Sequence, residues 1–196
     1  MNNYPEYVEV NGRKYKINTD FRYAIECNRI AEDETIGDFE RALGIICTLF
    51  GKEALDNKDD LEKLLTMAKK YLSCGEELKI TSEKEKDMDY IQDYDYIWTS
   101  FISDYNGLDL DKEEMHWWKF YRLLNGLSNS ELGNCCILNR IRNLRNYDLK
   151  DIKDPVQRQK IQEAKNAVAL KKKEKDVKLT EKQQKSVDEF YRSLGF

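Results

Sequence analysis

The first residues of the chain alternate between apolar and polar side chains, and a turn sequence interrupts the alternation. The two alternating runs cover residues 7–10 and 14–17, with Asn11 and Gly12 between them. Asn and Gly both tolerate the positive φ angles of a type I′ turn, so this pattern predicts a β-hairpin. An isolated hairpin is only marginally stable, and we therefore expect a helix or a partner strand to cover its apolar face. That face consists of Val8, Val10, Tyr15 and Ile17.

From about residue 18 onward, apolar residues recur three and four positions apart, which is the spacing of amphipathic helices. Capping residues and glycines set the expected boundaries. The predicted helices cover residues 18 or 19 to 31, 35–50, 57 or 59 to 75, 82–105, 111–125 and 128–144, and a last one begins after Asp154. Serine or aspartate followed three residues later by glutamate supports the starts at 82, 111 and 128. Proline at the first helical position, Pro155, supports the last start.

The predicted helix around residues 115–125 differs from the others because it is apolar on nearly all sides. A helix of this kind is typical of the centre of a core or of an assembly. Its large side chains are Trp117, Trp118, Phe120, Tyr121, Leu123 and Leu124. We expect at least one of the two tryptophans to be an ordinary core residue, since large aromatic residues are usually mostly buried.

The character of the chain changes after residue 170. Residues 171–176 are almost all charged and have no apolar face, which is typical of a solvated helix end or a linker. A short helix is predicted from Thr180 onward, with an apolar stripe of Val187, Phe190, Tyr191 and Leu194. The sequence therefore predicts a helical domain with an N-terminal hairpin over residues 1–170, followed by a basic linker and a short C-terminal helix over residues 171–196.

The amino-acid composition agrees with a helical fold and disfavours a many-stranded or membrane-spanning protein. The 196 residues include 36% charged residues but only 9 glycines and 2 prolines, too few for the turns of a many-stranded fold. We therefore predict a mostly α, multi-helix domain with a small β-hairpin. No apolar run approaches the ~18 residues that a membrane span needs, and the N-terminus has no signal-peptide pattern. Five irregularly spaced cysteines predict reduced thiols in a cytoplasm.

Charge is distributed unevenly along the chain. Residues 81–114 contain 11 acidic and 3 basic residues, whereas residues 153–185 contain 11 basic and 5 acidic residues. Such polarity can steer association between copies of the chain or toward an oppositely charged partner. Two solvated helix faces are the simpler interpretation. The net charge of −4 provides no general attraction to nucleic acid or to an anionic membrane.

Candidate catalytic and metal-binding residues are few. The single histidine, His116, follows Glu113 by three residues, but its apolar neighbours favour a packing role over acid–base catalysis. Four aspartates recur near residue 90 without the glycine turn and terminal glutamate of a calcium loop, so a solvated helix face is favoured. They are Asp87, Asp89, Asp93 and Asp95. We therefore expect neither an enzyme nor a bound cofactor or metal.

Three arginines provide the alternative of a nucleic-acid-binding regulator. Arg142 and Arg145 fall on one side of a predicted helix, as in some recognition helices, and Arg140 precedes them. No helix-turn-helix pattern precedes them and the chain is acidic overall, so nucleic-acid binding is disfavoured.

Residues 95–170 resemble a known protein family. The most specific block is Met-His-Trp-Trp-Lys-Phe at residues 115–120, followed closely by Leu-Asn-Gly-Leu at residues 124–127. Further matching stretches are residues 96–98, 105–110, 148–152 and 165–170. This pattern resembles the gene-product-fifteen family of long-tailed bacteriophages and of prophages of Gram-positive bacteria. With the hairpin and the first helix, the resemblance spans about residues 4–170.

The resemblance implies a tail assembly chaperone in the host bacterial cytoplasm, which binds the phage tape measure protein and itself during tail morphogenesis. The alternative is a structural tail or connector component that remains in the virion. For partner binding we single out Trp117, Trp118, Tyr121, Arg142 and Arg145. For self-association we single out Val8, Val10, Tyr15, Lys171, Lys172 and Lys173. The family supplies no catalytic residues.

Overall fold

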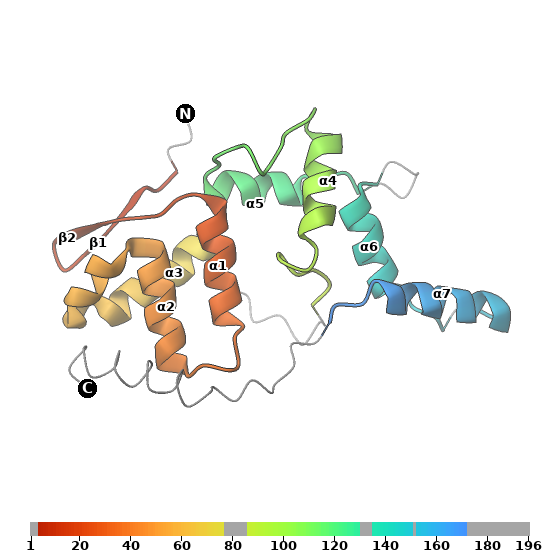
Figure 1. Cartoon of the computed structure of the whole chain (residues 1–196), viewed down its shortest axis with the longest axis horizontal. Helices are drawn as coiled ribbons and strands as arrows, with labels where there is room; N and C mark the ends of the chain where they lie inside the picture. The colour runs from red at the N-terminus through yellow and green to blue at the C-terminus, as the bar shows by residue number, and fades with distance from the viewer. Residues whose placement is uncertain (1–3, 77–85, 130–134, 151, 172–196) are drawn as a thin grey trace.

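The structure is a computed structural model that describes residues 4–76, 86–129, 135–150 and 152–171. Within these residues it has seven α-helices and one antiparallel hairpin, so the predicted mostly α fold with a small N-terminal hairpin is confirmed (Figure 1). The strands are β1 (Tyr7–Val10) and β2 (Arg13–Lys16). The helices are α1 (Phe21–Ala31), α2 (Asp38–Phe50), α3 (Leu61–Leu72), α4 (Tyr94–Asp104), α5 (Trp117–Asn125), α6 (Ile137–Asn146) and α7 (Pro155–Ala167). Two short 3-10 helices, η1 (Lys52–Asp56) and η2 (Lys58–Asp60), precede α3.

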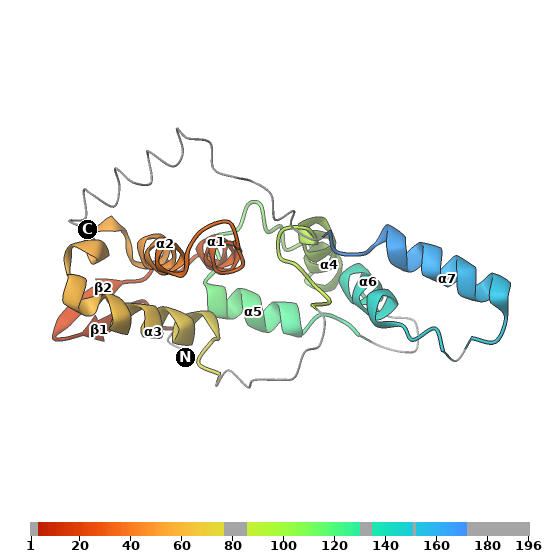
Figure 2. The ribbon, with the colours of Figure 1, turned by 90° about the horizontal axis from the view of Figure 1, so that it is seen from below.

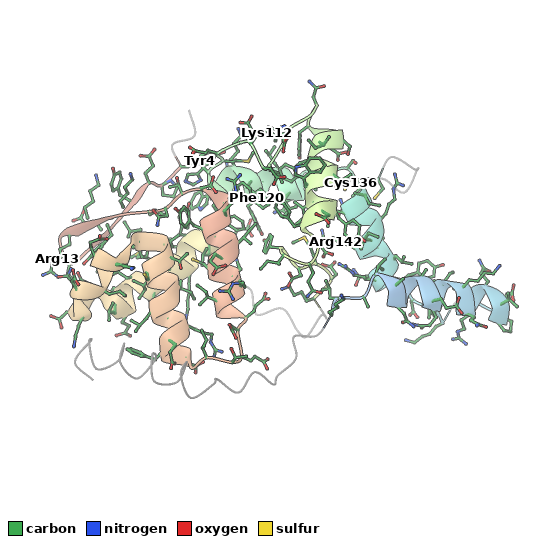
Figure 3. All side chains as sticks on the ribbon, in the orientation of Figure 1. Tyr4, Arg13, Lys112, Phe120, Cys136 and Arg142 are labelled. Atoms are coloured by element: carbon green, nitrogen blue, oxygen red, sulfur yellow. The ribbon has the colours of Figure 1, made fainter. Side chains whose placement is uncertain are left out.

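The hairpin forms around the predicted Asn11-Gly12 turn, with Val10 opposite Arg13. Asn11 and Gly12 have φ angles of 49° and 77°, as the turn requires. The cover that the hairpin needs is provided by the segment leading into α3. There the buried carboxylate of Asp60 accepts hydrogen bonds from Tyr15 (2.5 Å), Asn11 (2.5 Å) and Arg13 (3.0 Å), all from the hairpin (Figure 3).

These donors favour the charged form of Asp60. The hydrogen bond from the Tyr15 hydroxyl is the main influence that lowers the pKa of Asp60, and Asn11 and Arg13 act in the same direction against the effect of burial. One buried carboxylate thus anchors the turn and β2 to the start of α3.

A stack of aromatic rings joins the two halves of the molecule at α5. The ring of Phe120 lies between Phe21 of α1 and Phe101 of α4, with centroid separations of 4.5 Å and 5.3 Å. Trp117 lies against the same ring at 5.7 Å. All four side chains are at most 1% exposed. Figure 2 shows the result: α5 lies between the group of the hairpin and α1–α3 on one side and the group of α4, α6 and α7 on the other. The predicted central position of this helix is confirmed.

The start of α4 differs from the prediction. The expected cap at Ser82 lies outside the described residues, but residues 86–93 are described and are not α-helical. Aspartate side chains take the backbone N–H groups in this segment: Asp89 accepts from Ile91 and Gln92, and Asp93 accepts from Asp89. Because these carboxylates compete with helical hydrogen bonds, the helix begins only at Tyr94.

The predicted starts of α5 and α6 are also too early. Asp111 accepts a hydrogen bond from the Tyr94 hydroxyl instead of capping a helix, and α5 is capped by His116. The Ser128 N–H donates to Asp104, residues 130–134 lie outside the described residues, and α6 begins only after its cap at Cys136. The local capping patterns at Asp111 and Ser128 therefore do not mark the starts of these two helices.

The first three helices match the prediction within a few residues. Asp20 caps α1, one residue beyond Thr19 and two beyond Asn18, the two caps expected. Thr35 is not a cap, because its N–H and hydroxyl both donate to Asp33, and α2 begins at Asp38 after Gly37. The third helix is shorter than expected, since η1 and η2 occupy the residues before it.

The last described helix, α7, begins as predicted, with the Asp154 side chain accepting from the Val156 N–H. No residue of α7 is buried. Figures 1 and 2 both show it projecting at one end of the molecule. The short helix predicted from Thr180 lies outside the described residues. Across the described ranges, no helix is both long and apolar enough to span a membrane.

The aromatic stack generates a stability prediction. We expect Phe120→Ala to lower the free energy of unfolding by about 3–5 kcal/mol, because the cavity removes contacts with both neighbouring rings. Chemical denaturation measures the change. Tyr23→Ala on α1, where the side chain is 46% exposed, is the control and should change stability by about 0.5 kcal/mol or less. Equal losses in the two variants would contradict a central role for the stack.

Candidate partner-binding surfaces

Helix α5 has a buried face and a half-exposed face. Trp117 is 1% exposed, and its indole N–H donates to the Leu72 carbonyl at 3.0 Å, so the expectation that at least one tryptophan is core is confirmed. Trp118 is half-buried, and its indole N–H donates to the Tyr71 carbonyl at 2.9 Å. The two tryptophans together attach α5 to the end of α3.

The half-exposed face forms an aromatic surface that we call the Trp118 surface, made of Tyr4, Trp118, Tyr121 and Arg122. On α5, Tyr121 and Arg122 follow Trp118 by three and four residues and so lie on the same side of the helix. Tyr4 comes from the N-terminal segment and lies near the start of α5 (Figure 3). Its ring lies edge-on to Trp118 at 6.5 Å and beneath the Arg122 guanidinium at 5.3 Å. The polar atoms of Trp118 are already bonded, so the surface offers ring faces and one cation.

Tyr4 and Arg122 were not singled out from the sequence. Tyr4 lies 114 residues before Trp118, and nothing in the local pattern indicates that the two side chains meet. The signal that was available is the spacing of Arg122 from Trp118 on one helix.

His116 joins the N-terminal segment to the start of α5. Its Nδ1 accepts a hydrogen bond from the Trp118 N–H at 3.0 Å, so the ring proton belongs on Nε2, which lies 3.1 Å from the Pro5 carbonyl oxygen. The ring stacks on Tyr4 at 4.7 Å. Burial lowers the pKa of His116, opposed by the Pro5 carbonyl and the Glu6 carboxylate. Both nitrogens of the only imidazole are therefore engaged in holding the fold.

Arg142 and Arg145 both form ion pairs within the chain, and Arg145 is the more buried of the two. Arg145 forms two hydrogen bonds of 2.7 Å with the two carboxylate oxygens of Asp93, and its side chain is only 10% exposed. It also donates to the carbonyls of Asp87 and Val168. Arg142 pairs with the Asp87 carboxylate at 3.2 Å. Partner binding through these arginines stays a prediction, and the charge of Arg145 is already paired within the chain.

The interpretation of the aspartates near residue 90 as a solvated helix face is wrong for two of the four. Asp93 is 1% exposed and Asp89 is 7% exposed. They are buried because they cap the turn before α4 and, in the case of Asp93, because Arg145 neutralises the charge. In the described part of the chain, no group of three or more acidic, histidine or cysteine side chains is arranged to hold a metal ion.

The residues predicted for self-association are placed differently from one another. Val10 and Tyr15 are buried inside this chain, whereas Val8 is half-buried. Lys171 is exposed, and Lys172 and Lys173 lie outside the described residues. The side chains of Val10 and Tyr15 therefore belong to the chain's own core, and the accessible part of the hairpin is its solvent face and its edges.

Comparison with known proteins places the chain in context. The family model described as "Bacteriophage Gp15 protein" matches residues 1–170. The searches of curated proteins and of solved structures found no significant match.

The Asp93–Arg145 pair generates a prediction that separates an internal role from a partner-binding role. We expect Arg145→Met to lower the free energy of unfolding by about 3–5 kcal/mol, because it leaves the buried Asp93 carboxylate unpaired. Thermal or chemical unfolding measures this loss. The matched control is Arg158→Met on exposed α7, which should be close to neutral. Unchanged stability with lost partner binding would instead favour a surface role for Arg145.

The cap at His116 generates a prediction about pH. Because its pKa in the folded chain is below the ordinary value of 6.5, the unfolded chain binds a proton more readily. Stability should therefore be constant well above pH 6.5 and should fall as the pH drops from about 6.5 toward the folded pKa. Unfolding midpoints between pH 7 and pH 5.5 measure this slope. His116→Asn keeps a capping side chain but does not titrate, so its profile should be flatter; identical slopes would contradict the assignment.

Proposed function

The chain belongs to the bacteriophage Gp15 protein family, and on that basis we propose that it is a tail assembly chaperone. In this role it binds the phage tape measure protein and other copies of itself in the host bacterial cytoplasm, and it leaves before the virion is complete. The resemblance in residues 95–170 implies this role, and the Trp118 surface is the observation that carries it.

The Trp118 surface has the chemistry needed to hold a helical protein. An amphipathic helix binds through apolar side chains spaced three and four residues apart, which need aromatic or aliphatic anchors on the receptor. Trp118 and Tyr121 present such anchors at the matching spacing on a helix that the aromatic stack holds rigidly. Aromatic residues and arginine are also the types that contribute most to binding energy in protein interfaces.

The other functions considered from the sequence have less support. Acid–base catalysis by His116 would need a free imidazole nitrogen, and His116 is occupied as a helix cap with its second nitrogen at the Pro5 carbonyl. A nucleic-acid-binding role would need Arg142 and Arg145 on the surface, and Arg145 is held by Asp93. A structural tail component remains the alternative to a chaperone, and composition of the particle distinguishes them.

The test is co-expression of the chain with the phage's tape measure protein, followed by co-purification and light-scattering mass. We expect a soluble complex with the wild-type chain and at least a tenfold loss of captured partner in Trp118→Ala and Tyr121→Ala. Tyr23→Ala removes an exposed aromatic ring from α1 and is the matched control. Because Trp118→Ala also loses the hydrogen bond to Tyr71, each variant is first compared by thermal unfolding, and Tyr121→Ala serves if Trp118→Ala is unstable.

Two results would overturn the proposal. The first is that Trp118→Ala and Tyr121→Ala capture as much tape measure protein as the wild-type chain does. That result would mean that the Trp118 surface does not hold the partner. The other is the presence of the chain in purified virions at the copy number of a structural protein, measured by mass spectrometry.

A further inference from the structure

Helix α7 lacks the packing that stabilises the other helices. None of its 13 residues is buried, and Val156 is 62% exposed. Within the described chain, two hydrogen bonds join α7 and the residue after it to neighbouring segments, and both lie at the C-terminal end of the helix. Lys165 donates to the Tyr147 carbonyl, and Arg145 donates to the Val168 carbonyl at 2.7 Å. A helix of this length is marginal on its own in water, since most helical stability in proteins comes from packing.

The charge of this segment is basic. Residues 155–171 contain Arg158, Lys160, Lys165 and Lys171 against a single acidic residue, Glu163. Arg158 and Lys160 are exposed on the part of the helix farthest from its tether. The helix therefore presents cations and exposed aliphatic side chains together.

A surface of the opposite character lies over α4. The loop of residues 108–114, which we call the acidic loop, has four acidic residues and one lysine. Glu113 and Glu114 are exposed, while Asp109 and Asp111 accept hydrogen bonds from Trp98 and Tyr94 of α4. Those two aromatic rings are half-exposed, so acidic groups and apolar surface lie side by side.

The two surfaces lie on different parts of the molecule. Figure 3 places Lys112 of the acidic loop at the edge above α5, whereas α7 projects beyond α6 at the end of the molecule, and Figure 2 keeps the two apart. A contact between them is therefore a contact between two chains.

We propose that α7 of one copy docks on the acidic loop and α4 of the next copy. The charges are complementary, and Val156 finds apolar cover beside Tyr94 and Trp98. Because the two surfaces differ, the contact is head-to-tail, and its repetition builds a ring or a helical array. This inference rests on the proposed self-association and names the surfaces that produce it.

The experiment is a charge swap read by light-scattering mass over a range of protein concentrations. The arm variant is Arg158→Glu/Lys160→Glu, and the loop variant is Glu113→Lys/Glu114→Lys. Each alone should raise the dissociation constant of self-association about tenfold or more, because attraction becomes repulsion. An equimolar mixture of the two variants should regain association, since the now acidic α7 of the arm variant meets the now basic loop of the loop variant. The difference between each variant and wild type should shrink at high salt, which screens exposed charges.

The control is Lys69→Glu/Lys70→Glu on exposed residues of α3, which changes the net charge by the same amount as the arm variant. It should leave association unchanged. A wild-type chain that stays monomeric, an arm variant that associates normally, or a mixture that fails to regain association would each overturn the docking proposal. Capture of the tape measure protein is measured in parallel: if it persists in such a case, the chaperone proposal stands without the docking contact. If the arm variant loses capture but still associates, α7 binds that partner instead, and the docking proposal is wrong.

Discussion

The stacking of Phe120 between Phe21 and Phe101 is the contact on which the rest of the structure depends. These rings come from α5, α1 and α4, so they join the hairpin group to the α4–α6 group in one continuous apolar contact. Stacked rings at 4.5–5.3 Å bury large areas and restrict orientation, so the stack sets the angle of α5 as well as its position. The half-exposed face of α5, with Trp118 and Tyr121, is positioned by the same contact.

Two buried carboxylates organise the segments that hydrophobic periodicity does not. Asp60 holds the hairpin to the start of α3, and Asp93 holds the turn before α4 to Arg145 of α6. Buried ion pairs contribute little net stability, since desolvation offsets attraction. Their importance here is geometric: each carboxylate bonds donors from segments 45 or more residues apart, so only one arrangement satisfies it.

The sequence predicted the fold class, the hairpin with its Asn11-Gly12 turn, and the presence of the helices α1 to α7, because those features depend on spacing within a segment. The predicted starts of α4, α5 and α6 were too early, because they relied on capping patterns in the local sequence. Asp111 was expected to cap a helix, yet it accepts a hydrogen bond from the Tyr94 hydroxyl, and α5 is capped by His116. Ser128 was expected to begin the next helix, yet α6 is capped by Cys136. Such contacts depend on the tertiary fold, and so does the meeting of Tyr4 with Trp118, which no spacing rule contains.

The two surfaces left for partners differ in the physics of binding. On the Trp118 surface the indole N–H is already bonded to Tyr71, so a partner gains by covering apolar rings, and that gain depends little on salt. On α7 the exposed groups are Arg158 and Lys160, whose contribution to binding falls as salt screens charge. A chain that binds a partner helix on the Trp118 surface and other copies of itself through α7 can retain one contact while it loses the other. Ionic strength therefore separates the two interactions in one purified protein.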